Sequence, residues 1–102
     1  MPDPDALRRE AERLHKEAES IERHAHDVES QLRAHEQTIR NLEQQRQDWQ
    51  NRLHNAEMQL SGASDPNQRN AINQQLQDIN RKLTDMDRQI QGARWEHDKM
   101  RH

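Results

Sequence analysis

Residues 7–60 read LRREAERLHKEAESIERHAHDVESQLRAHEQTIRNLEQQRQDWQNRLHNAEMQL, and this stretch decides the fold. Apolar side chains recur along it in alternating steps of four and three residues, without a slip. They are Leu7, Ala11, Leu14, Ala18, Ile21, Ala25, Val28, Leu32, Ile39, Leu42, Trp49, Leu53, Ala56 and Leu60, with His35 and Arg46 filling the two remaining places. A mean spacing of 3.5 residues is typical of a helix whose apolar face lies along another helix. The stretch therefore predicts one long coiled-coil helix.

The composition agrees with elongated helices rather than a compact core. Of 102 residues, 28% are hydrophobic and 34% are charged, and Phe, Tyr and Cys are absent. The net charge of −3 gives no reason to expect a nucleic-acid or membrane partner. The N-terminal order Met-Pro-Asp-Pro-Asp is not that of a signal peptide, and the lack of Cys is compatible with the cytosol. We expect a cytoplasmic protein, and secretion without a cleavable signal stays open.

The first helix is expected to end in the sequence SGASDPNQ, which begins at Ser61. Gly62 suits the left-handed residue that closes a helix, whereas Asp65 and Pro66 suit the cap and first position of the next helix. We predict a polar lead-in at 1–5, a helix at 6–61, a turn at 62–65 and a second helix at 66–102. The second helix carries the same repeat, at Ile72, Leu76, Ile79, Leu83, Met86, Ile90, Ala93, His97 and Met100.

An antiparallel register with a short turn aligns the two repeats. It places Leu53 beside Ile79 and His35 beside His97. The expected fold is all-α: a long antiparallel two-helix coiled-coil hairpin with unequal arms.

The charges beside the repeats test this register. Glu43 falls near Arg94, which is opposite in sign, and near Asp87, which is not. Arg46 interrupts the apolar repeat, and we expect its side chain to reach Glu43 or the water at the edge.

The unequal arms leave part of the first helix without a partner in the chain. In the expected register the second helix ends opposite Leu32. Residues 32–60 are therefore the hairpin arm, and residues 7–28 are an overhang with no partner in the chain. Two copies of the overhang can pair antiparallel, with Leu7 beside Ala25 of the second copy and Arg8 near its Glu22. The expected dimer or partner seam is Leu7, Ala11, Leu14, Ala18, Ile21, Ala25 and Val28. We therefore expect a homodimer, the commonest oligomer.

The sequence contains no motif typical of a metal site or a catalytic site. The seven His residues include no pair four apart, and no HExxH motif or Cys/His cluster exists. We expect no metal, no cofactor and no catalytic site. His35 and His97 are expected to share a polar core layer, which specifies register and disfavours double protonation.

Trp95 is the candidate surface anchor. Its place in the repeat is the outermost one, and Gly92 leaves a notch one turn earlier. An exposed Trp is either a tolerated surface residue or part of an interface, since Trp is enriched among binding hot spots. Met58 is the other large apolar residue at such a position.

An unequal hairpin of this kind resembles the antiparallel coiled-coil stalk proteins of flagellar and type III secretion export ATPases. It is also similar in length to small secreted helical hairpins, whose Trp-x-Gly turn is replaced here by Ser61-Gly62-Ala63. We expect a non-catalytic structural or adaptor protein that acts through coiled-coil contacts. The alternative is a secretion-associated chaperone or stalk-like partner that binds a helix of another protein, and an RNA-binding hairpin arm is a third hypothesis.

Overall fold

In the computed structural model, residues 3–101 are described. Residues 1, 2 and 102, which belong to the expected lead-in and to the expected second helix, lie outside that part. Over the described residues the chain forms two α-helices, α1 at Pro4–Gly62 and α2 at Pro66–Arg101. This confirms the all-helical prediction.

The start of each helix follows from a local capping contact. The Asp3 carboxylate accepts a hydrogen bond from the Asp5 N–H (3.1 Å), and the Asp65 carboxylate accepts one from the Asn67 N–H (3.2 Å). In both cases proline occupies the first helical position, where its missing N–H leaves no donor unsatisfied. Two Asp-Pro steps in the sequence therefore set the two helix starts.

The end of α1 differs from the prediction. Gly62 is the last residue of the helix and has no positive φ, so the expected left-handed closure was wrong. The helix ends instead in a tight turn, in which the Ala63 N–H donates to the carbonyl of Leu60, three residues earlier (3.2 Å). The Arg69 guanidinium donates to the carbonyls of Leu60 (3.1 Å) and Ala63 (2.8 Å). The Arg69 side chain of α2 thus provides hydrogen-bond donors for carbonyls at the end of α1. A glycine in the left-handed conformation is not needed to supply them.

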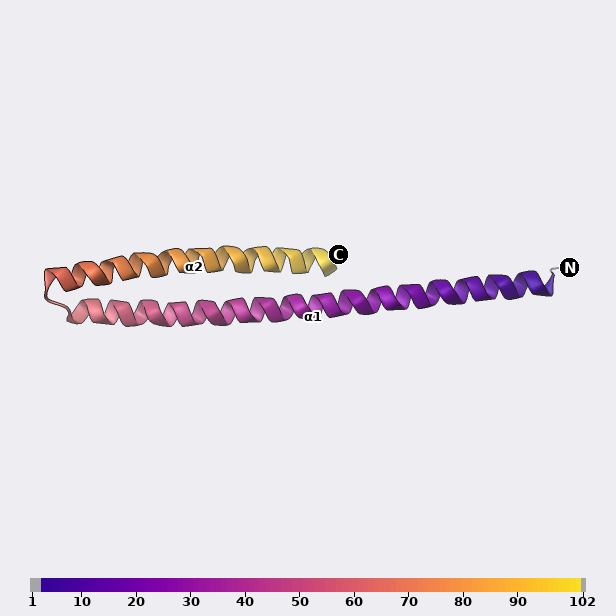
Figure 1. Ribbon diagram of the computed structural model, residues 1–102, viewed down its shortest axis with the longest axis horizontal. Coiled ribbons are helices and arrows are strands. Elements are labelled where there is room, and N and C mark those ends of the chain that lie inside the picture. The colour runs from indigo at the N-terminus through magenta and orange to yellow at the C-terminus, as the bar shows by residue number, and fades with distance from the viewer. Residues whose placement is uncertain (1–2, 102) are drawn as a thin grey trace. The chain divides into compact units, whose positions relative to one another are not determined.

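Residues 35–101 contain the buried core. Its buried residues are Ala56, Ala63, Ile72, Ile79, Leu83, Met86 and Ile90. Trp49, Leu53, Leu60 and Leu76 are partly buried and pack against this core. The core therefore takes side chains from both helices, which pack against each other in a hairpin joined at residues 63–65 (Figure 1). This confirms the predicted helical hairpin.

Polar contacts between the helices lie beside the core. Glu43 accepts a hydrogen bond from Arg94 (2.6 Å), as the register predicted. Arg46 does not reach Glu43: its Nε donates to Asp87 Oδ1 at 2.5 Å. Of the two expected outcomes the contact with Glu43 is not made, because Arg94 pairs with Glu43; the Arg46 side chain, 38% exposed, pairs with Asp87 at the water edge. The hydrogen bond raises the pKa of Arg46, so the cation is retained beside the core.

Residues 3–34 form a separate unit that consists of one helical segment of α1. Every residue from 3 to 27 is exposed. Residues 3–34 are therefore a single helical segment, with an apolar stripe along one side and charged residues beside that stripe.

Candidate interaction surface

The apolar stripe of residues 7–28, here called the N-terminal seam, consists of Leu7, Ala11, Leu14, Ala18, Ile21, Ala25 and Val28. The first six are exposed and Val28 is partly buried. The exposed fractions of Leu14 and Ile21 are 52% and 69%. Because one α-helix holds all seven at steps of four and three, they lie along one side of it. Fully burying a Leu or Ile side chain is worth about 1.5–3 kcal/mol, so covering this stripe is favourable.

One edge of the N-terminal seam carries an ion-pair cluster. The Arg13 Nε donates to Glu10 Oε2 (3.2 Å), a second nitrogen contacts Glu10 Oε1, and the third donates to Glu17 Oε1 (2.8 Å). The hydrogen bonds to Glu10 and Glu17 raise the pKa of Arg13. One guanidinium therefore holds Glu10 and Glu17, the glutamates that immediately precede Ala11 and Ala18. Sequence reasoning missed this cluster, although the spacing of three and four residues on either side of Arg13 could have indicated it.

The other edge of the N-terminal seam is more open. Arg8 lies 3.5 Å from Asp5, and both side chains are largely exposed. The Nε2 atom of His15 lies 2.9 Å from Glu19 Oε1. Arg8 is thus available to a further carboxylate.

Of the two residues of the predicted polar layer, His97 lies on α2 and His35 on α1. The His97 side chain is mostly buried, and its Nε2 lies 3.1 Å from Glu36 Oε1, to which the ring N–H donates. Its Nδ1 lies 3.9 Å from Asp98. His35 is partly buried on α1. The hydrogen bond of the His97 ring thus goes to a carboxylate, and a layer shared with His35 stays a prediction.

Trp95 lies on the surface of α2, with 58% of it exposed. The Lys99 Nζ lies 4.1 Å from the centroid of its ring, a cation–π contact. A Cβ added at Gly92 would meet open space. Trp49, by contrast, is partly buried and packs on the core, with the Arg52 guanidinium 4.4 Å from its ring centroid. Only the exposed Trp95 remains a candidate anchor.

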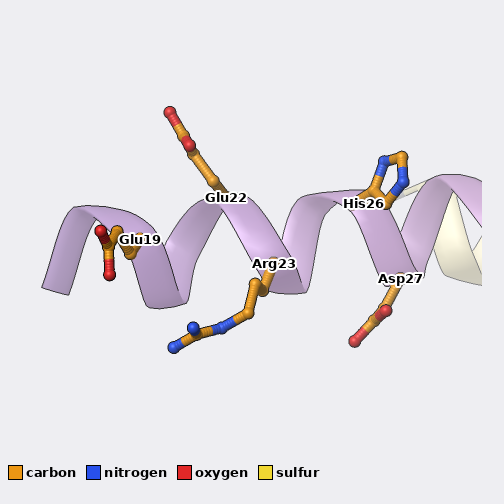
Figure 2. A pocket seen from close by; sticks show the side chains of 5 residues that line it. All are labelled: Glu19, Glu22, Arg23, His26 and Asp27. Carbon is orange, nitrogen blue, oxygen red and sulfur yellow. The ribbon is translucent and has the colours of Figure 1, made fainter. Parts of the chain in front are cut away.

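A hollow on the surface of α1 offers no cation site. Its lining side chains are Glu19, Glu22, Arg23, His26 and Asp27. Figure 2 shows Glu22 and His26 leaving the helix on one side and Arg23 and Asp27 on the other, so their polar atoms do not converge. Among the described residues, no group of three or more His, Cys, Asp or Glu side chains could hold a metal ion.

No helix in residues 3–101 is long and apolar enough to cross a membrane. No protein-family model matches the chain, and neither the curated proteins nor the solved structures include a match.

Proposed function

We propose that this chain is a non-catalytic coiled-coil interaction module, a structural or adaptor protein that forms a homodimer through the N-terminal seam. One observation carries the proposal: α1 repeats the same apolar spacing in residues 7–28 as in residues 35–60, and in 7–25 that stripe is exposed. A stripe of apolar residues at this spacing is typical of a surface that another helix covers.

The hairpin itself supports the coiled-coil part of the proposal. Buried residues on α2 recur at steps of seven, four, three and four residues: Ile72, Ile79, Leu83, Met86 and Ile90. The polar contacts join Glu36 to His97 and Glu43 to Arg94, so the residue number falls on α2 as it rises on α1. This order is expected of an antiparallel coiled coil, in which charged residues beside the seam set the register.

A foreign helix is the alternative occupant of the N-terminal seam, as in a secretion-associated chaperone or stalk-like protein. The same surface would serve both functions, and the mass of the purified chain separates them. A cytoplasmic location stays a prediction.

The test compares two substitutions in the N-terminal seam with one outside it. We expect Leu14→Glu with Ile21→Glu to convert a dimer into a monomer, because buried unpaired carboxylates oppose association. Met58→Glu, at an exposed apolar position outside the seam, is the matched control and should leave the dimer unchanged.

Sedimentation equilibrium gives the mass, and far-ultraviolet circular dichroism checks that the helices are retained. A parent chain that is monomeric at micromolar concentration, or a double variant that is still dimeric, would contradict the proposal.

A further inference from the structure

We propose that the second copy lies antiparallel on the N-terminal seam, with Leu14 of one copy in the same layer as Ala18 of the other, and that Arg13 neutralises the acidic edge of this interface. The inference rests on the proposed homodimer and adds its orientation, its register and the residue that permits it.

The sizes of the seam residues favour this orientation. Small and large residues alternate along the N-terminal seam, with Ala at 11, 18 and 25 and larger side chains at 7, 14 and 21. An antiparallel pair combines one position of each kind in every layer, so each layer holds one Ala and one large residue. A parallel pair in register would alternate Ala–Ala layers with large–large layers. Uneven layers leave voids that forfeit packing contacts, because the helix separation cannot suit both kinds.

The charges on the open edge favour the same orientation. An antiparallel pair brings Arg8 near Glu22 of the second copy, twice over by symmetry. A parallel pair would instead bring Glu17 near Glu22 of the second copy. Opposite charges across a coiled-coil edge select the orientation, and like charges oppose it.

The acidic edge is where Arg13 becomes necessary. The antiparallel register brings Glu17 of both copies together at the symmetry axis, with Glu10 of each copy one heptad further out on the same edge. These glutamates would repel one another if they were unpaired. In the structure Arg13 already holds both of them, at 3.2 Å from Glu10 Oε2 and 2.8 Å from Glu17 Oε1. Each copy thus supplies a cation to the edge.

Cysteine crosslinking tests the orientation. The chain has no Cys, so an introduced thiol has no competitor. We expect a Leu14→Cys chain mixed with an Ala18→Cys chain to form a disulfide across the interface. Leu14→Cys alone should crosslink poorly, because its two thiols would be offset by four residues, about 6 Å along the axis. With the separation of the helices added, this exceeds the roughly 7 Å between Cα atoms that a disulfide tolerates.

Efficient crosslinking of Leu14→Cys with itself, and no disulfide between the Leu14→Cys and Ala18→Cys chains in the mixture, would overturn the antiparallel orientation. Sedimentation of the reduced chains shows separately whether they dimerise, so a failure of the proposed homodimer is distinguishable from a wrong orientation.

A second experiment tests Arg13 with a matched arginine. Arg13→Gln should raise the dimer dissociation constant several-fold at low salt, and added salt should shrink this difference because it screens the glutamates. Arg9→Gln removes the same charge from the exposed face and should have a smaller effect. Equal weakening by both variants, or no weakening by Arg13→Gln, would overturn the role of Arg13.

Discussion

Two regions of the molecule carry one sequence pattern and differ in burial. In the N-terminal seam Leu14 is 52% exposed, whereas Leu83 of α2 belongs to the buried core. Both leucines occupy repeat positions of long α-helices, and both helices are otherwise polar. The repeat thus specifies which face of a helix is apolar, and only the presence of a facing helix decides whether that face is buried.

The largest expected effect comes from truncating the same residue type in both regions. Ile90 is buried and Ile21 is exposed. Ile90→Ala should lower the free energy of unfolding by about 2–5 kcal/mol, because it removes packed side-chain volume from the core. Ile21→Ala should change it by less than about 0.5 kcal/mol when the chain is dilute. Urea unfolding followed by circular dichroism measures both, and equal losses in dilute solution would contradict the comparison.

A smaller effect is expected at the polar interruption of the hairpin. Arg46 and Asp87 bond to each other beside the core, and partly exposed ion pairs contribute little to stability. Arg46→Leu with Asp87→Asn should therefore raise the free energy of unfolding, by less than Ile90→Ala lowers it, because an apolar residue restores the repeat. Asp87→Asn alone is the control and should not stabilise. A less stable double variant would show that the ion pair outweighs apolar burial.

The sign of the pH dependence at Arg46 follows from its raised pKa. The contribution of the cation is fully present below the ordinary pKa of an arginine side chain and is lost only as the pH rises through the raised pKa of Arg46. Arg46 should therefore add no pH dependence to stability near neutrality.

The smallest effect is expected at His97. Its ring donates to Glu36, and a carboxylate is a stronger acceptor than a neutral amide. Glu36→Gln should therefore destabilise the hairpin by about 0.5–1 kcal/mol. Thermal melts measure the loss, with the exposed Glu57→Gln as control. Equal melting temperatures for the two variants would contradict a stabilising role of this contact.

Most of the hairpin could be predicted from the sequence, because the period of 3.5 residues is a global signal that no single residue can overturn. The sequence also indicated the Glu43–Arg94 contact, which follows from the register. Local choices were harder. Gly62 was expected to close α1 in a left-handed conformation, but Arg69 supplies a competing solution from the next helix. The sequence offered Arg46 two carboxylates, Glu43 and Asp87. Which of them it pairs with depends also on Arg94, which pairs with Glu43.

The N-terminal seam shows a different limit. Periodicity predicted which of its residues share a face, and the structure places them on one helix. What covers that face depends on a second chain, and the fold of one chain carries no direct signal of it. The charged edge of the N-terminal seam, and the alternation of Ala with larger residues along it, are the features that indicate what covers it.

Amide hydrogen exchange as a function of protein concentration tests the central claim most directly. Residues 72–90 contain the buried residues of α2 and serve as an internal reference. Their protection from exchange should not change with protein concentration. If a second copy covers the N-terminal seam, exchange in residues 7–25 should slow as the concentration rises through the dimer dissociation constant, because association suppresses local opening of the helix. Fast exchange in residues 7–25 at every concentration, beside an unchanged reference, would contradict the account.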